Sequence, residues 1–141
     1  MRNFYIFQIK SEIEILLKDN PYELFHTLQT IYYRTGDERA QYLIANQIID
    51  KIDMKNMDIS LFKRFQENYF YTKYKNIHAM HDVYRKENTI LSLHKSYIKL
   101  QTNVIKPRFL EELKKYHRLF ICDFETIDYF WLDSLSIASF L

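Results

Sequence analysis

Three carboxylates stand close together near the C-terminus, at Asp123, Glu125 and Asp128. Carboxylates at short spacing can act as general acid and base, or bind a hard cation such as Ca²⁺. Aspartate is also favoured in turns, because its side chain hydrogen-bonds to nearby backbone groups. Dense apolar runs flank the three residues, at 119–122 and 129–132. We therefore expect a hairpin with a polar turn here and not an active site.

Two other residue types invite a chemical interpretation. His78 and His81 are three residues apart and could ligate zinc on a helix, but no third ligand follows at a diagnostic spacing. Cys122 could be a nucleophile, yet it ends an apolar run without a neighbouring base and is expected to pack as a small apolar residue. We therefore expect no metal, no cofactor and no enzymatic activity.

Two alternatives remain open. Residues 62–75 interleave aromatic side chains with lysine and arginine, a composition typical of surfaces that stack bases and follow phosphates. The same spacing also fits a helix with an apolar stripe and a basic outer face. An acyl-CoA-dependent transferase is the second alternative, but pyrophosphate binding usually needs a glycine-rich turn, and the chain's one glycine is Gly36.

The bulk composition limits the class of protein. The 141 residues are 48% hydrophobic and 17% aromatic, which predicts one folded domain spanning residues 1–141. A net charge of +2 is too small for a general electrostatic attraction to nucleic acid, so direct nucleic-acid binding is not expected. One cysteine and the absence of an apolar run of about 18 residues favour a cytoplasmic protein without a membrane span.

The order of apolar and capping patterns predicts an α/β (α+β) fold, with a small mixed sheet of about five strands and helices packed on it. Strands are expected at 3–9, 89–93, 97–101, 119–122 and 129–132, and 77–85 fits either a helix tail or a strand. Helices are expected at 12–18, 21–33, 38–52, from Asp58 towards Lys75, and after Pro107, with a capping box at Ser11–Glu14 and a glycine cap at Gly36.

The first predicted helix carries aliphatic residues on more sides than one core can absorb. Ile13 and Leu17 share one side, whereas Ile15 lies nearly opposite. On the helix predicted at 38–52, a more exposed stripe comprises Ile44, Gln47 and Lys51. If the two helices are neighbours, Ile13 and Leu17 could form one binding surface with this stripe; alternatively, they pack inside and Ile15 is exposed.

Several segments resemble one known family. They are FYIFQIKSE at the N-terminus and FLEELKKY, LFICDF and YFWLDSL near the C-terminus. Together they are similar to SirA, the sporulation inhibitor of replication in Bacillus-type bacteria. The resemblance implies a small α/β protein without catalysis, which inhibits chromosome replication by binding the N-terminal domain I of the initiator DnaA.

The resemblance also implies where the partner binds. The family contacts DnaA through its first helix and a neighbouring helix, and the matching positions here are Ile13 and Leu17 on the first and Gln47, or the adjoining Ile48, on the second. Where sporulating relatives have aromatic residues, this chain has aliphatic ones. Including their neighbours, the predicted partner-binding residues are Ile13, Glu14, Leu17, Ile44, Gln47 and Lys51.

Overall fold

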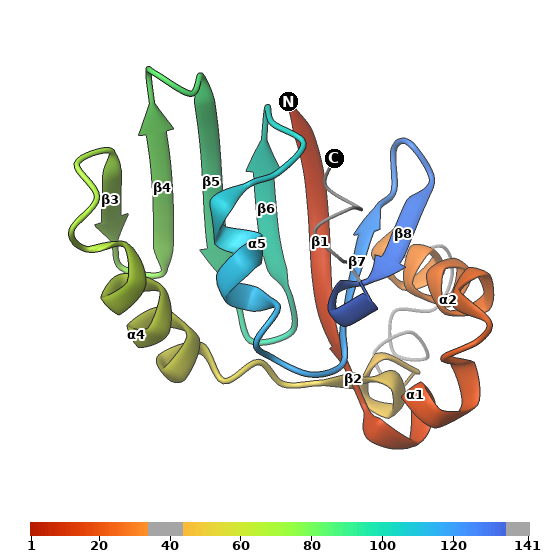
Figure 1. The fold of residues 1–141 in the computed structure, drawn as a ribbon. Coiled ribbons are helices and arrows are strands. Elements are labelled where there is room, and N and C mark those ends of the chain that lie inside the picture. The colour runs from red at the N-terminus through yellow and green to blue at the C-terminus, as the bar shows by residue number, and fades with distance from the viewer. Residues whose placement is uncertain (34–43, 135–141) are drawn as a thin grey trace.

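The computed structural model describes residues 1–33 and 44–134, and within them the fold is α+β (Figure 1). The strands are β1 (Arg2–Ile9), β2 (Ile49–Asp50), β3 (Tyr71–Tyr74), β4 (Ile77–Asp82), β5 (Glu87–Leu93), β6 (Ile98–Thr102), β7 (Leu119–Asp123) and β8 (Asp128–Trp131). The helices are α1 (Ser11–Leu17), α2 (Pro21–Tyr33), α4 (Met54–Phe65), α5 (Arg108–Leu113) and the 3-10 turn η1 (Leu132–Ser134), and residues 44–48 are also helical.

The sheet is larger than the sequence pattern predicts. All eight described strands join one sheet in the order β3-β4-β5-β6-β1-β7-β8, and the short β2 pairs with the last two residues of β1. Every pairing is antiparallel, so the expectation of a mixed, roughly five-stranded sheet is wrong. The missed strands are β2, β3 and, as an ambiguous segment, β4, because short and polar strands give a weak periodic signal.

β1 separates two hydrophobic cores, as its two apolar sets predict. Phe4 and Ile6 enter the core under α4 and α5, which we call the first core. Phe7 and Ile9 enter the core under α2, which we call the second core. The strand is flanked by β6 on one side and β7 on the other. It is therefore an inner strand buried on both faces.

β7 repeats this pattern with its own alternation. Leu119 and Ile121 pack into the first core, and Phe120 and Cys122 pack into the second, with all four side chains fully buried. β8 pairs with β7 through a turn at 124–127, so the predicted hairpin is confirmed. The hairpin at 89–93 and 97–101 is confirmed in the same way by β5 and β6.

Two helix starts differ from the predictions. Lys10 is the N-cap of α1 and its side chain makes no cap hydrogen bond, while the Ser11 hydroxyl bonds to Glu12; the predicted capping box is therefore absent. α4 begins after Asp53, whose carboxylate accepts from the backbone N–H of Asn56 at 3.3 Å, and not after Asp58. Asp58 lies inside the helix, where its carboxylate is used for tertiary contacts.

The helix predicted at 38–52 is shorter at its C-terminal end. Residues 44–48 are helical, but Ile49 and Asp50 form β2 and pair with Ile9 and Gln8 of β1. The apolar spacing of Ile48, Ile49 and Ile52 fits a helix equally well, so periodicity alone could not reveal this change. The predicted start of this helix and the predicted cap at Gly36 lie outside the described residues.

Within the described ranges, four residues other than glycine adopt positive φ angles, namely Lys75, Lys86, Arg118 and Ile127. Ile127 is the least suited to this conformation because its β-branched side chain crowds the backbone. The chain carries one glycine, and at these four positions ordinary residues adopt the left-handed conformation that glycine tolerates best. In the described parts of the chain, no helix has both the length and the apolar character needed to cross a membrane.

Candidate protein-interaction surface

α1 and the helix at 44–48 are neighbours at one end of the sheet (Figure 1). The backbone N–H of Lys10, just before α1, donates to the carbonyl oxygen of Ile48 at 2.9 Å. The next residues, Ile49 and Asp50, pair with the end of β1. The two helices are thus connected through β1 and β2, which satisfies the condition under which the sequence predicts a shared surface.

The two faces of α1 differ in burial. Ile13 and Leu17 are half-buried and pack against the second core, which favours the alternative that they turn inward. Ile15 is 80% exposed and Leu16 is 74% exposed. Leu16 was not singled out from the sequence; at about 100° per residue it lies between Ile15 and the side of Ile13, and its exposure shows that this flank of α1 is also uncovered. The outward aliphatic pair of α1 is therefore Ile15 and Leu16.

The three residues of the predicted stripe are exposed, although Lys51 lies beyond the helix, after β2. Ile44 is 40% exposed, and Gln47 and Lys51 are also exposed. Ile48, the adjoining residue, instead packs against the second core. We call Ile15, Leu16, Ile44, Gln47 and Lys51 the α1 surface.

Charged groups surround the aliphatic pair of α1. Glu12 and Asp19 are exposed; Glu12 lies three residues before Ile15 on the same side of α1, and Asp19 follows the C-terminal end of the helix. Glu14 is half-buried, and its carboxylate lies 3.6 Å from Lys18 Nζ. Lys18 also reaches Asp133 at 3.5 Å and lies over the ring of Trp131 at 4.8 Å, which attaches the end of α1 to β8 and η1.

Two carboxylates of the β7–β8 hairpin, Asp123 and Asp128, form structural contacts. Asp123 is buried and accepts from the backbone N–H groups of Glu125 and Thr126 and from Arg2 Nε at 3.0 Å. Burial opposes its ionisation, but the Thr126 and Arg2 contacts outweigh it and lower the pKa of Asp123. Asp128 pairs with Arg2 at 3.0 Å. The turn is therefore polar and self-bonded, as predicted.

His78 and His81 do not face one another. They lie on β4, where residues three apart point to opposite faces, so His78 is buried and His81 is exposed. His78 Nδ1 lies 2.6 Å from the Tyr71 hydroxyl, and its Nε2 lies 2.8 Å from Asp58. Burial lowers the pKa of His78 although Asp58 opposes this, and burial raises the pKa of Tyr71 to about 12. The arrangement suits a neutral imidazole that joins α4 to β3 and β4.

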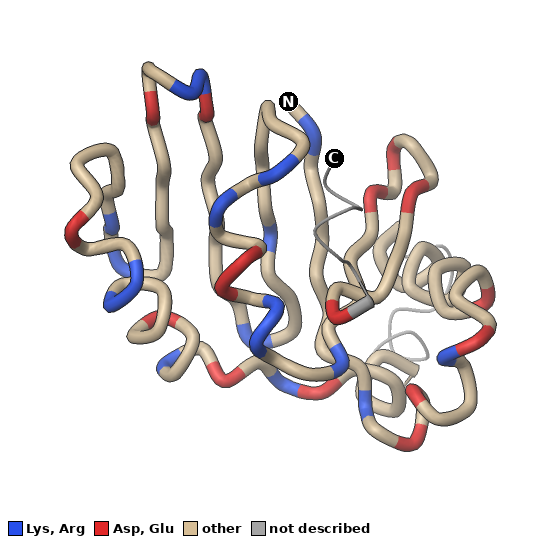
Figure 2. The backbone as a smooth tube through the Cα atoms, viewed as in Figure 1, with Lys and Arg blue, Asp and Glu red and all other residues tan. Residues whose placement is uncertain are grey.

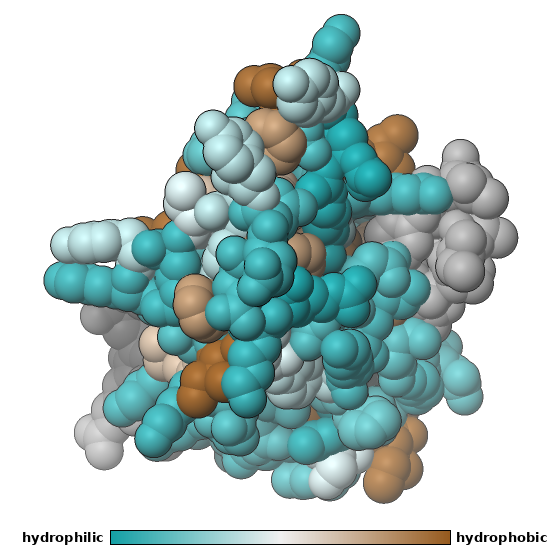
Figure 3. Space-filling model, turned by 60° about the vertical axis from the view of Figure 1, so that its left-hand side comes forward, coloured by the Kyte–Doolittle hydropathy of each residue, from teal (hydrophilic) through white to brown (hydrophobic). Residues whose placement is uncertain are grey.

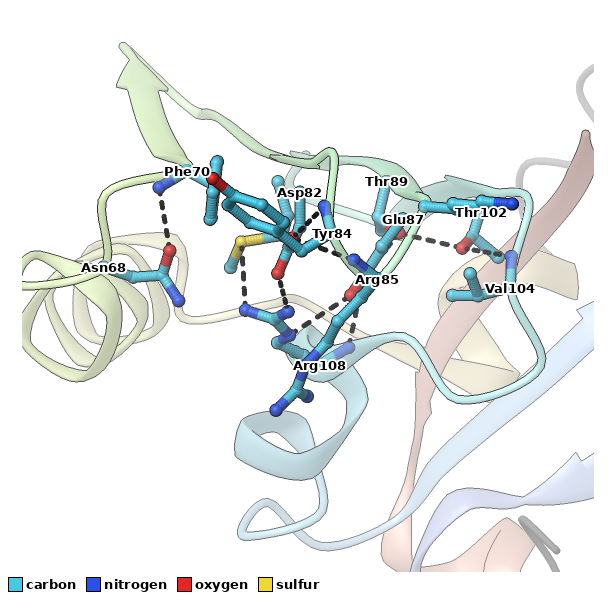
Figure 4. Close-up of polar contacts among 12 residues, drawn as sticks. Asn68, Phe70, Asp82, Tyr84, Arg85, Glu87, Thr89, Thr102, Val104 and Arg108 are labelled. Atoms are coloured by element: carbon cyan, nitrogen blue, oxygen red, sulfur yellow. Dashed lines mark hydrogen bonds and ion pairs between the residues drawn. The ribbon is translucent and has the colours of Figure 1, made fainter.

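A second polar cluster attaches α5 to the β4–β5 hairpin (Figure 4). Arg108 forms ion pairs with the buried Asp82 and, through Nε at 3.3 Å, with the buried Glu87. The hydroxyl of Thr89 donates to Glu87 at 2.8 Å and contacts Thr102 at 2.8 Å. Each charge in the cluster is compensated, so the cluster stabilises the fold, although Arg108 Nε makes no hydrogen bond beyond its ion-pair contact with Glu87.

The basic aromatic segment is divided among several environments. Phe65 is buried in the first core, and Tyr69 and Tyr74 are exposed. Its cations are partly neutralised, because Arg64 pairs with Glu112 at 3.2 Å and Lys73 pairs with Asp58 at 3.2 Å. The face turned forward in Figure 3 is mostly hydrophilic, with separate apolar groups and no continuous apolar patch. The nucleic-acid alternative thus lacks a row of stacked aromatic residues beside free cations in this part of the chain.

The remaining chemical candidates can be placed directly. Cys122 is buried in β7, and burial raises its pKa, so the thiolate form is disfavoured. Among residues 1–33 and 44–134, no group of three or more His, Cys, Asp or Glu side chains is arranged to hold a metal ion. Comparison of the sequence with protein-family models finds no matching family, and comparison with curated proteins finds no significant match.

Proposed function

We propose that this protein is a cytoplasmic, non-enzymatic, SirA-like regulator that binds domain I of DnaA and inhibits the initiation of replication. The proposal combines the resemblance of the N- and C-terminal segments with one structural observation. Ile15 and Leu16 are adjacent aliphatic residues on a seven-residue helix, and both are about three-quarters exposed or more. Isolated apolar residues on a surface need no explanation, but these two are consecutive in the chain, and the neighbouring helix at 44–48 carries a further exposed aliphatic residue, Ile44.

The chemistry of the α1 surface defines its partner. Burying Ile15 and Leu16 in an interface would contribute roughly 3 kcal/mol or more. A stable interface covers roughly 800 Å² on each partner, so polar neighbours such as Gln47 and Lys51 must form its rim. The exposed Glu12 and Asp19 favour a partner with an apolar depression bordered by basic residues. Binding would act sterically, by covering a surface that domain I needs for self-association.

The six residues predicted from the sequence remain predictions of the contact set. Ile44, Gln47 and Lys51 are exposed and available, whereas Ile13 and Leu17 are half-buried and would contribute mainly by positioning α1. Glu14 would act through its ion pair with Lys18. We therefore propose that the apolar centre of the interface is formed by Ile15 and Leu16, and not by Ile13 and Leu17.

Isothermal titration calorimetry with the cognate DnaA domain I tests the proposal. We expect saturable one-to-one binding by the full chain, with affinity reduced at least about thirtyfold by the double substitution Ile15→Asp and Leu16→Asp, which corresponds to a loss of about 2 kcal/mol. A matched control is the double substitution Val83→Asp and Ile105→Asp, because these side chains are 73% and 84% exposed and lie outside the α1 surface. No binding by the folded wild-type chain would refute the proposal.

A further inference from the structure

A small hollow lies where β1, the end of α2 and the β7–β8 turn meet. Its volume is about 260 Å³, and it is lined by Asn3, Tyr5, Tyr32, Tyr33, Phe124 and Glu125. Pockets for drug-sized ligands measure roughly 300–1,000 Å³, so this hollow suits a single side chain or a small ion. None of its lining residues belongs to the α1 surface.

The walls of the hollow are aromatic. The ring of Tyr32 stacks on Phe124 at 4.6 Å between centroids, and it also contacts Tyr5 at 4.8 Å and Tyr33 at 5.0 Å. Phe124 is buried, whereas Tyr32 and Tyr33 are 42% and 52% exposed. Aromatic faces carry negative partial charge and attract cations placed over them. The side chains that line the hollow thus offer π faces without a positive group.

The polar groups of the hollow are acceptors in need of donors. Asn3 Oδ1 is buried and has no hydrogen-bond partner, an arrangement that is rare in folded proteins. The Tyr5 and Tyr32 hydroxyls bond to one another at 3.2 Å, which raises the pKa of Tyr32. In the described part of the chain, the Glu125 carboxylate takes part in no ion pair, while its neighbours Asp123 and Asp128 both bind Arg2.

The local charge is negative. The β7–β8 hairpin carries acidic residues at its turn (Figure 2). A basic position lies beside it, near the start of β1. Lys99, opposite Tyr5 on β6, is the other cation near the rings, and its Nζ lies 5.8 Å from the Tyr5 centroid. That distance is at the limit of about 6 Å for a cation–π contact, and Lys99 does not line the hollow.

From these features we infer that the hollow binds a guanidinium group. A guanidinium is planar and stacks on aromatic faces, keeps its charge at every physiological pH, and directs several N–H donors outward. These donors match the exposed Glu125 carboxylate, which forms no ion pair within the described residues, and they would also match the buried Asn3 Oδ1 after a small movement of the wall that uncovers it. Anions are repelled by Glu125, and neutral groups lack the electrostatic attraction that a cation has to the π faces and to this carboxylate. The guanidinium can come from an arginine of a protein partner or from a free guanidino compound.

The test is a titration of the ¹⁵N-labelled full chain, monitored through its NMR chemical shifts. The probes are N-acetyl-L-arginine methylamide, its neutral counterpart N-acetyl-L-citrulline methylamide, and free L-arginine. We expect the blocked arginine to bind with a dissociation constant on the order of 1 mM and to shift the Asn3 side-chain amide and the backbone amides of Glu125 and Thr126. Citrulline should bind at least about tenfold more weakly, because it lacks the charge.

The two arginine probes distinguish the sources. Tighter binding of the blocked form indicates an arginine within a polypeptide, since blocking removes the terminal charges that a chain would not present. Tighter binding of free L-arginine indicates a small-molecule ligand. Equal binding of arginine and citrulline, or no saturable shift up to about 10 mM, would overturn the inference.

Substitutions locate the site. Glu125→Gln removes the charge at an exposed position without changing its shape, and it should weaken binding of the blocked arginine about fivefold or more. Asn3→Leu removes the unpartnered acceptor and should also weaken binding. Glu111→Gln is the matched control, since Glu111 is an exposed carboxylate on α5 that does not line the hollow. Unchanged affinity in both Glu125→Gln and Asn3→Leu, with the fold retained by thermal unfolding, would contradict the assignment.

Discussion

The backbone N–H of Lys10 donates to the carbonyl oxygen of Ile48 at 2.9 Å, and this contact holds two elements from distant parts of the sequence side by side. The bond lies where β1 passes into α1, and β2 continues the pairing immediately afterwards. A surface built across α1 and residues 44–48 therefore rests on the end of the inner strand β1 and on β2, and not on a loop. This relationship carries the proposed function, because it makes one surface from two short helices.

The inward and outward residues of α1 should respond differently to the same substitution. Ile13→Asp places a charge against the second core and should lower the free energy of unfolding by about 2–3 kcal/mol. Ile15→Asp changes an exposed position and should alter it by no more than about 0.5 kcal/mol. Urea denaturation followed by circular dichroism measures both. Equal losses would show that the inward and outward faces of α1 are wrongly assigned.

His78 should make stability depend on pH in mildly acidic solution. Its pKa is lowered in the folded protein by burial, so below a pH of about 6.5 the unfolded chain binds the proton that the folded chain resists. Stability should therefore be full above that pH and should fall as the pH drops towards the lowered pKa, with a slope of at most about 1.4 kcal/mol per pH unit. Chemical denaturation at a series of pH values between 5 and 7.5 measures the slope.

Two substitutions attribute that slope to His78. His78→Gln should remove it, even if the overall stability is lower, because Tyr71 and Asp58 lose a titrating partner. His81→Gln, on the exposed face of the same strand, should leave it unchanged. A slope that persists in His78→Gln would assign the pH dependence to another group.

Arg108 should be among the polar residues that contribute most to stability. Arg108→Met leaves the buried Asp82 and Glu87 without their cation, and an unpaired buried charge costs more than the pair contributes. Arg85→Met is the matched control in the adjoining hairpin, where the exposed side chain should contribute no more than about 0.5 kcal/mol. Thermal and urea unfolding should show a several-fold larger loss for Arg108→Met. Similar losses would mean that the carboxylates find other partners or become protonated.

The sequence predicts the central part of the fold better than its edges. The double alternation of β1 and the apolar runs around Asp123 have strong periodic signals, and both are confirmed with their burial on two faces. The sequence pattern does not predict β2 and β3, which begin at Ile49 and Tyr71, because two- and four-residue strands are determined by their partner strands and not by their own periodicity.

The candidate surface was predictable only in outline. The excess of aliphatic residues on the first helix is visible in the sequence, and so is the stripe at Ile44, Gln47 and Lys51. Which side of α1 turns inward depends on the angle at which the chain leaves β1, and this angle is set by tertiary contacts such as the bond between Lys10 and Ile48. The guanidinium site escaped notice because its lining comes from three separate segments.

Ile127 offers a test of backbone strain. Its φ angle is 56°, and a β-branched residue in the left-handed region costs roughly 1–2 kcal/mol, whereas asparagine tolerates it. Since the side chain is 62% exposed, Ile127→Asn loses little burial and should stabilise the protein by about 1 kcal/mol. Differential scanning calorimetry would record a higher midpoint. A lower midpoint would mean that the contacts of the isoleucine side chain outweigh the relief of strain.

The most direct test of the proposed function is calorimetry of the full chain with DnaA domain I, run in parallel on the wild type, on the Ile15→Asp and Leu16→Asp double variant and on the Val83→Asp and Ile105→Asp control. We predict one-to-one binding by the wild type and the control, and loss of at least about thirtyfold in affinity for the α1 variant, with all three proteins folded. Absence of binding by the wild type, or equal affinity of all three, would contradict the account.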